Sequence, residues 1–300
     1  MKLTTKKLLF VLGVLVIVLA VTQLTKREGR SKSLKSELVS IDTAKVSKIE
    51  IITGEENLTL SMEEEWKVSL PDGSQKTAKE SSVISLLRSL NTIKPGRMAA
   101  KSQDKWKDYS VDSTGTRVKV FEKNKISTDI VIGRFGVEGQ QSFYTFVRLF
   151  EDDEVYVAND FMGMSIGKDA ASYRENEILR LQKDSLISIS FNYPDSAFKL
   201  TKGEEWYLQD QQADSAAVAD YLNELSFVSS REFYDQSSEI NPTHTVIYEF
   251  SSQQEIKLEV QYTEENTILK SSENPNELFA DNSLGEKLLK GRGEFLTKGK

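Results

Sequence analysis

The chain of 300 residues contains no cysteine and a single histidine, His244. Without cysteine there is no disulfide, no thiol nucleophile and no thiolate metal site. A lipid-modified lipoprotein is excluded as well, because its lipid is carried on a cysteine. One histidine cannot build a His-cluster metal centre. We therefore expect no metal site and no other cofactor.

Motifs for enzymatic chemistry are also scarce. The sequence has no Gly-x-Ser-x-Gly nucleophile elbow and no Gly-Lys-Ser/Thr phosphate loop. Gly133-Arg134-Phe135-Gly136 predicts a turn between antiparallel strands. His244 could serve as the base of a Ser-His-Asp arrangement, but we expect a loop or strand-edge histidine. The prediction is a protein that is not an enzyme and has no catalytic residues.

Clusters of acidic residues are plentiful and each has two readings. Glu63–Glu65 and Gly203–Glu205 each precede a tryptophan. Neighbouring strand residues point to opposite faces, so exposed turn acids are expected there rather than a catalytic carboxylate pair. Glu151–Glu154 could gather a calcium ion, but it lacks the EF-hand spacing. We expect a charged hairpin tip at that position.

The charge of the chain is divided unevenly. Residues 1–35 hold eight Lys or Arg and one acid, whereas residues 36–300 hold 31 basic and 45 acidic residues, a net charge of −14. An acidic body without a basic stripe argues against nucleic acid as a partner. It argues equally against a protein that lies flat on anionic lipid.

One long apolar run is present, residues 8–24, and it contains no charged residue. Its length is at the short limit for a membrane-spanning helix. We expect an uncleaved signal anchor with a short cytoplasmic tail at 1–7 and a solvated linker at 25–40; a cleaved signal peptide is the alternative. The long chain after the anchor is expected on the extracytoplasmic side of the inner (cytoplasmic) membrane, which makes the protein single-pass.

The remainder of the sequence contains an internal repeat. A shift of 140 positions, the spacing of Trp66 and Trp206, aligns two stretches without a gap, each with apolar alternation, a polar turn and Glu-Glu-Trp. The aligned positions are Val46, Ile49, Ile51, Leu58, Leu60, Trp66 and Val68 over Leu186, Ile189, Phe191, Phe198, Leu200, Trp206 and Leu208. Such a repeat is typical of a scaffold that folds as two similar modules.

Helical spacing follows each tryptophan. The i, i+3, i+4, i+7 pattern is carried by Val83, Leu86, Leu87 and Leu90 in the first copy, and by Val218, Tyr221, Leu222 and Leu225 in the second. We therefore predict an α+β fold with two tandem modules of antiparallel strands and a packed helix, at residues 41–180 and 181–297. The expected order in each is strand-strand-helix-strand-strand-strand and a short terminal helix, which pairs Arg174–Leu179 with Arg292–Leu296.

The tryptophans have two readings. Trp66, Trp106 and Trp206 could form a surface that stacks on a sugar or another ligand. Trp66 and Trp206 occupy equivalent positions, which favours equivalent packing against the helix of each module. We place each at the end of the second strand, on the same face as Leu58 and Leu60 or Phe198 and Leu200.

Several short motifs resemble the DUF4340 family, bacterial proteins of unknown function. They are Ser47–Ile51, Glu64–Val68, Asp108–Asp112, Asp129–Gly133, Phe143–Arg148, Val155–Val157 and Tyr173–Asn176, after the hydrophobic anchor. Asp108–Asp112 is similar to a Tyr-Gly-Leu-Asp pattern in which Ser110 replaces the glycine. The resemblance implies a single-pass membrane protein, often associated with a gliding-motility-type ABC transport system, its permease and a large membrane-anchored subunit.

The predicted function is therefore a membrane-anchored extracytoplasmic accessory or binding subunit of an envelope transport system. The membrane, through the N-terminal helix, and an ABC transporter permease or membrane-anchored subunit are the expected partners; nucleic acid is not. A cell-envelope hydrolase or transferase and a stand-alone glycan- or ligand-binding module are the alternatives.

Overall fold

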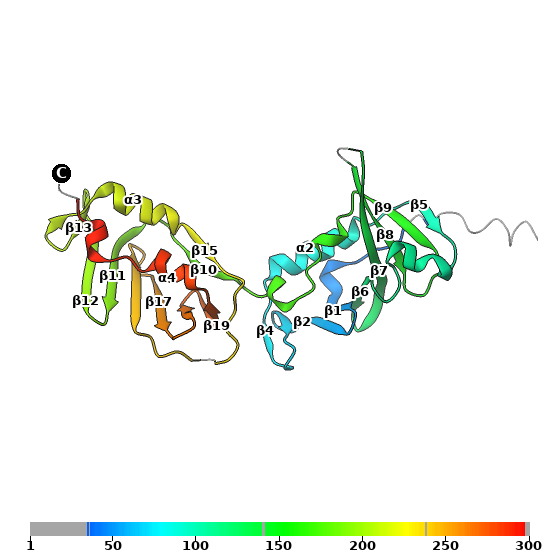
Figure 1. Ribbon diagram of the computed structural model, residues 1–300, viewed down its shortest axis with the longest axis horizontal. Helices are drawn as coiled ribbons and strands as arrows, with labels where there is room; N and C mark the ends of the chain where they lie inside the picture. The colour runs from blue at the N-terminus through cyan, green and yellow to red at the C-terminus, as the bar shows by residue number, and fades with distance from the viewer. Residues whose placement is uncertain (1–34, 36, 140–141, 238, 298–300) are drawn as a thin grey trace, which may run out of the picture. The chain divides into compact units, whose positions relative to one another are not determined.

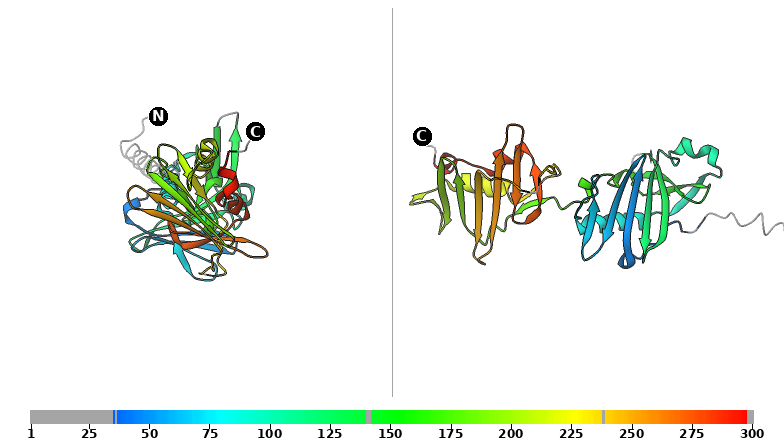
Figure 2. Two further views of the ribbon diagram at one scale, coloured as in Figure 1. Left: turned by 90° about the vertical axis from the view of Figure 1, so that its left-hand side faces the viewer. Right: turned by 90° about the horizontal axis from the view of Figure 1, so that it is seen from below.

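The computed structural model of the chain describes residues 35, 37–139, 142–237 and 239–297. Their fold consists of two large antiparallel sheets accompanied by helices, which confirms the α+β class (Figure 1). The strands of each sheet run side by side (Figure 2).

The first sheet has nine strands in the order β4-β3-β2-β1-β6-β7-β8-β9-β5. The strands are β1 Val46–Thr53, β2 Glu56–Met62, β3 Trp66–Ser69, β4 Gln75–Thr77, β5 Pro95–Ala100, β6 Thr116–Glu122, β7 Lys125–Glu138, β8 Ser142–Leu149 and β9 Val155–Asn159. The helices of this part are α2 Glu80–Asn91 and the 3-10 helices η1 Thr43–Lys45, η2 Gln103–Tyr109, η3 Gly163–Ser165 and η4 Ala170–Ser172.

The second sheet has eight strands in the order β14-β13-β12-β11-β16-β17-β18-β19. They are β11 Leu186–Tyr193, β12 Ser196–Lys202, β13 Trp206–Leu208, β14 Gln211–Gln212, β16 His244–Phe250, β17 Glu255–Tyr262, β18 Thr267–Ser271 and β19 Asn274–Ala280. A separate pair joins β10 Glu177–Arg180 to β15 Phe227–Ser229. The helices are α3 Ser215–Glu224, α4 Asn282–Leu288 and the 3-10 helix η5 Arg292–Phe295.

The two sheets repeat one strand order, which confirms the internal repeat. Each strand from β1 to β4 and from β6 to β9 has a counterpart ten numbers higher at the same place in the second sheet. The helices α2 and α3 follow β4 and β14 at corresponding points of the chain. The copies differ at one strand: β5 pairs with β9 in its own sheet, whereas β15 pairs with β10 outside the second sheet.

The described chain divides into two compact units. One holds the residues up to 45, with 52–55 and 87–166; the other holds 46–51, 56–86 and the residues from 167 onward. The module boundaries expected from the sequence, 41–180 and 181–297, stay a prediction.

The predicted strand position of the tryptophans is wrong. The chain reverses at Glu63–Glu65, and Trp66 begins β3, opposite Met62 of β2. Trp206 begins β13 in the same way, opposite Lys202. Two short strands therefore precede each helix in addition to the two expected. The sequence pattern did not reveal the reversal, because a turn of three polar residues leaves the apolar residues at alternate positions on both sides of it.

The burial expected from the pattern is nevertheless observed. Trp66 is 6% exposed, and Leu58, Leu60 and the four apolar positions of α2 are buried as well. In the second copy Trp206 is partly buried, against a core cluster that includes Phe198, Leu200 and the apolar positions of α3. That cluster packs α3, labelled in Figure 1, against the eight-stranded sheet and includes Leu284 and Leu288 of α4.

Two further expectations about the ends of elements differ from the structure. Arg174–Leu179 does not form a helix like Arg292–Phe295, because Arg174 pairs with Ala78 in a β-bridge and Glu177 begins β10. Gly133 and Gly136 do not lie in a turn but inside β7, where the pairing with β8 shifts register between Ile132 and Phe135. Glycine within a strand commonly marks such a bulge or a close backbone approach.

Among the described residues, no helix combines the length and the apolar character that crossing a bilayer requires. The expected tail 1–7 and anchor 8–24 lie outside those residues, as does most of the linker 25–40. The end of the linker is not solvated as expected, since Leu38 and Val39 are buried.

Candidate functional site

A hollow of about 400 Å³ opens in the smaller compact unit, beside η2 and the ends of β6 and β8. Its wall combines the aromatic rings of Trp106 and Phe150, the guanidinium groups of Arg117 and Arg148, and the apolar side chain of Val131. Ligand sites of proteins have this size and this mixture of apolar wall and few charged groups.

Arg148, near the end of β8, is the most buried charged group of the hollow and is 3% exposed. Its Nε donates to Val111 O at 3.1 Å. Its Nη1 donates to Phe150 O at 2.7 Å and also contacts the carbonyl oxygens of Leu149 and Asp152, at 3.2 and 3.1 Å. The guanidinium is thus held by backbone carbonyls of one tight turn and of the loop after η2.

Backbone carbonyls do not neutralise the charge of Arg148. No carboxylate of the described chain lies within ion-pair distance of it, and Nη2 makes no hydrogen bond to a described residue. Burial lowers the pKa of Arg148, because a desolvated cation is less stable than a hydrated one. An unpaired cation in such a position is an expected property of a binding site.

Trp106 covers this guanidinium. The Cζ of Arg148 lies 3.6 Å from the ring centroid of Trp106, within the range of a cation–π contact. Trp106 Nε1 donates to Asp153 O at 3.0 Å, which fixes the ring against the turn between β8 and β9. Of the three tryptophans considered as stacking residues, Trp106 alone lines this hollow; Trp66 is buried, and Trp206 packs against the core cluster of the second sheet.

Arg117 of β6 supplies a second guanidinium. Its Nε and Nη2 form a bidentate pair with the carboxylate of Asp129, at 2.8 and 2.7 Å. Its Cζ lies 3.1 Å from the ring centroid of Phe150. The charge of Arg117 is therefore neutralised by Asp129 of the adjacent strand β7, in contrast to the charge of Arg148.

The loop 110–115 forms one side of the hollow, and two glycines allow its backbone to approach its neighbours closely. A Cβ on Gly133 would lie 2.3 Å from Tyr109 O, and a Cβ on Gly115 would lie 2.6 Å from Ser110 O. Asp112 accepts from Thr114 N and Thr114 Oγ1 at 3.1 and 2.6 Å, and these hydrogen bonds lower the pKa of Asp112. The motifs at 108–112, 129–133 and 143–148, separate in the sequence, meet at this point.

His244, the candidate base, lies at the start of β16 in the second sheet. Its Nδ1 is 2.9 Å from Thr243 Oγ1, and its ring packs between Tyr193 and Tyr262, with centroids 5.1 and 5.0 Å away. Partial burial lowers the pKa of His244. His244 is thus the first residue of a strand that lies between β11 and β17.

The acidic clusters occupy the turns expected for them. Glu63–Glu65 links β2 to β3, and Glu65 pairs with Lys67. Glu151–Glu154 links β8 to β9, where Asp152 pairs with Lys35. In the part of the chain that the structure describes, no group of three or more His, Cys, Asp or Glu side chains is arranged to hold a metal ion.

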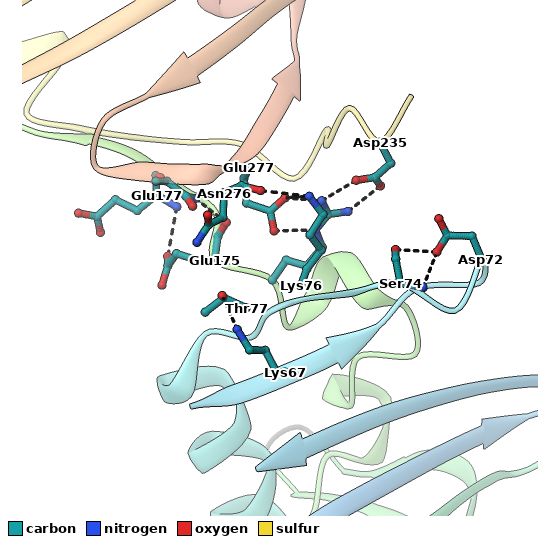
Figure 3. Close-up of polar contacts among 12 residues, drawn as sticks. Lys67, Asp72, Ser74, Lys76, Thr77, Glu175, Glu177, Asp235, Asn276 and Glu277 are labelled. Carbon is teal, nitrogen blue, oxygen red and sulfur yellow. Dashed lines mark hydrogen bonds and ion pairs between the residues drawn. The ribbon is translucent and has the colours of Figure 1, made fainter. Parts of the chain in front are cut away.

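A second buried arginine, in the larger unit, shows how this fold neutralises a guanidinium. Arg174 is 3% exposed and forms a bidentate pair with Asp235, both distances 2.7 Å, and a second pair with Glu277. Figure 3 labels the two carboxylates of this cluster, Asp235 and Glu277. Its Cζ stands 3.8 Å from the ring centroid of Phe233. Burial opposes its charge, but the bonds to Asp235 and Glu277 outweigh burial and raise the pKa of Arg174. This cluster ties three distant segments together and is structural.

Sequence reasoning did not single out Arg148 or Arg117, because arginine on a strand has no spacing that distinguishes a buried cation from a solvated one. The available signal was the position of Arg148 at the end of Phe143–Arg148, a motif on which the family resemblance rests.

The comparisons with known proteins agree with that resemblance. No curated protein and no solved structure matches the chain. The family model described as a domain of unknown function (DUF4340) matches residues 66–246, from β3 of the first sheet into β16 of the second. This span includes the whole loop 110–115 and Arg148, and it exceeds half of the 300 residues. The chain therefore belongs to the DUF4340 family.

Proposed function

We propose that this protein is a non-catalytic accessory or binding subunit of an ABC-type transport system of the cell envelope. In this proposal residues 8–24 anchor it in the inner membrane and the two repeated sheets lie on the extracytoplasmic side. The uncharged apolar run and the membership of the DUF4340 family support it. The association with an ABC transporter rests on the family resemblance.

The observation that carries the binding role is the hollow around Arg148. Its donors and rings are held in place by contacts within the protein: backbone carbonyls, Asp129 and the turn at Asp153. A site of fixed geometry loses little conformational entropy on binding, which favours affinity. A stand-alone ligand-binding module is the second candidate, and the same hollow favours it.

Recovery of partners from membranes distinguishes the two candidates. The full chain is cross-linked in cells, extracted in detergent and purified, and the proteins bound to it are identified by mass spectrometry. A transporter subunit is expected to copurify with the permease and ATPase of one ABC system in fixed ratio. If the chain is recovered alone under conditions that preserve other membrane complexes, the transporter role is wrong and the stand-alone module is favoured.

The orientation is tested separately with protease. Added to intact spheroplasts, protease is expected to degrade residues 41–297, whereas a cytoplasmic control protein survives. If those residues survive in spheroplasts and are lost only after permeabilisation, the extracytoplasmic placement is wrong.

A further inference from the structure

We propose that the hollow around Arg148 binds a small ligand that carries an anionic oxygen group, carboxylate or phosphate, beside a ring or another apolar face. This inference rests on the binding role proposed above and specifies the class of ligand. It can fail while the rest of that proposal stands.

The anionic group follows from a comparison of three arginines in the same protein. Arg174 is neutralised by Asp235 and Glu277, and Arg117 by Asp129. Arg148, although as buried as Arg174, has carbonyl oxygens as its hydrogen-bond acceptors and no carboxylate partner among the described residues. A buried cation without a counterion is costly, and a bound anion removes that cost.

The available donor is in the right place. Nε and Nη1 of Arg148 are used by the protein, which leaves the two N–H groups of Nη2 without a described acceptor. Arg148 lines the hollow, so an anionic oxygen that enters it reaches a guanidinium whose position is already fixed. Hydrogen bonds between a charged donor and a charged acceptor are about twice as strong as neutral ones.

The nearby carboxylates do not compete for this donor. Asp112 is engaged by Thr114, Asp129 by Arg117, and Asp152 by Lys35. Asp129 and Asp152 are paired with cations, whereas Thr114 is neutral and leaves Asp112 its negative charge. The charge of Asp153 also favours the Arg148 cation, but no carboxylate of the described residues lies within ion-pair distance of Arg148, so its Nη2 stays available to a bound anion.

The ring or apolar face follows from the rest of the wall. A single carboxylate or phosphate is much smaller than a hollow of about 400 Å³. The remaining surface is formed in large part by Ile52, Val131, Trp106 and Phe150. Aromatic and aliphatic walls of this kind favour an apolar ring, or the C–H face of a sugar ring, next to the anion.

The test uses the full chain in detergent with ¹⁵N-labelled tryptophan, and follows the indole Nε1 signal of Trp106, assigned by its loss in Trp106→Phe. The probes are D-glucuronate, glucose 6-phosphate, D-glucose, acetate and inorganic phosphate. A saturable shift of the Trp106 signal is expected with glucuronate or glucose 6-phosphate, and a much smaller one with glucose or either free ion. The two sugar acids distinguish a carboxylate from a phosphate ligand.

Two matched variants locate the site. Gln103 is an exposed residue of η2 that lines the hollow, and Gln103→Glu adds a negative charge there without changing a buried contact. It is expected to weaken the binding of the anionic sugar about threefold or more, by like-charge repulsion. Gln212→Glu, the same change at an exposed position of β14, is expected to leave the affinity unchanged.

The outcomes that overturn the inference are specific. If neither sugar acid shifts the Trp106 signal, if glucose binds as well as glucuronate, or if Gln103→Glu and Gln212→Glu bind alike, the hollow is not an anion site. If these probes fail but ABC subunits still copurify, the ligand class is wrong and the transporter role stands. If the probes bind and no subunit copurifies, the ligand class stands and the transporter role is wrong.

Discussion

Ser110 has a left-handed backbone, with φ 54° and ψ 37°, at the C-terminal end of η2. Residues with a Cβ pay roughly 1–2 kcal/mol in this conformation, and glycine does not. This explains why the Tyr-Gly-Leu-Asp pattern that the segment resembles has glycine at this position. The loop that contacts Arg148 is therefore slightly strained in this chain.

Ser110→Gly is expected to stabilise the protein by up to about 1 kcal/mol, since relief of strain outweighs the greater freedom of glycine in the unfolded chain. Denaturant unfolding measures the change. Ser102→Gly is the control, because Ser102 is extended, with φ −145° and ψ 153°, and glycine there is expected to destabilise. Equal destabilisation by both substitutions would contradict the argument.

The two equivalent tryptophans differ in burial, since Trp66 is 6% exposed and Trp206 is only partly buried. Trp66→Ala is expected to cost about 3–5 kcal/mol, the usual range for a fully buried aromatic, and Trp206→Ala less. Thermal and urea unfolding of both variants give the comparison. A Trp66→Ala variant that unfolds like the wild type would show that this side chain is not part of the core.

Tyr221 and Tyr248 form a buried pair whose hydroxyl oxygens lie 3.0 Å apart, and Tyr221 Oη donates to Leu288 O at 2.8 Å. Burial raises the pKa of both phenols, so the folded state retains their protons above the ordinary value of 10.0, where the unfolded chain loses them. Stability is therefore fully present below pH 10 and falls as the pH rises above it, by up to about 1.4 kcal/mol per pH unit for each tyrosine.

Tyr248→Phe is expected to reduce this alkaline loss, as measured by unfolding midpoints at a series of pH values from neutral to strongly alkaline. The substitution leaves Tyr221 its bond to Leu288, so no buried donor is orphaned. Tyr207→Phe is the control, because Tyr207 is exposed on β13. Identical alkaline slopes in the wild type and Tyr248→Phe would contradict the assignment.

At the scale of elements, the helices α2 and α3 were predictable and the short strands were not. A helical stripe of apolar residues repeats over several turns, whereas β3, β4, β13 and β14 are two to four residues long and show no periodicity of their own. The turn predicted at Gly133 proved to be a bulge within β7, because glycine is common both in turns and where two backbone segments come close together.

Helix α3 has a defined start that a substitution can test. The Asp214 carboxylate accepts from Ala216 N at 3.0 Å and Ala217 N at 3.1 Å, as an N-cap does. Asp214→Ala is expected to cost about 1 kcal/mol, and Asp214→Asn only a fraction of that, because asparagine caps equally well. Chemical unfolding of the two variants measures the difference. Equal losses would mean that the negative charge, and not the cap, stabilises the helix.

At the scale of the whole molecule, one strand order is used twice, yet the copies have diverged in chemistry. The hollow with Arg148 lies in the loops and strand ends of the first copy, and the position of His244 lies in the second. Divergence in loops on a repeated scaffold is the usual way for a duplicated fold to carry one specific site.

Removal of the N-terminal residues tests the placement of the whole chain. A chain that starts at Ser36 is expected in the soluble fraction of cells, with an unfolding midpoint close to that of the full chain, because no second long apolar run exists in the sequence. The full chain is expected in the membrane fraction. Both forms in the soluble fraction would show that residues 8–24 do not act as an anchor.

The repeat, the α+β class and the burial of Trp66 followed from the sequence by itself, because period-two and helical spacing are local properties of neighbouring residues. Only the tertiary structure showed that Arg148 donates to the carbonyl of Val111, 37 positions away, and that Arg174 donates to the carboxylate of Glu277, 103 positions away. Two strand arginines look alike in a sequence. Whether a guanidinium meets carboxylates or an open hollow depends on which distant segments the sheet brings beside it, and no local pattern records that.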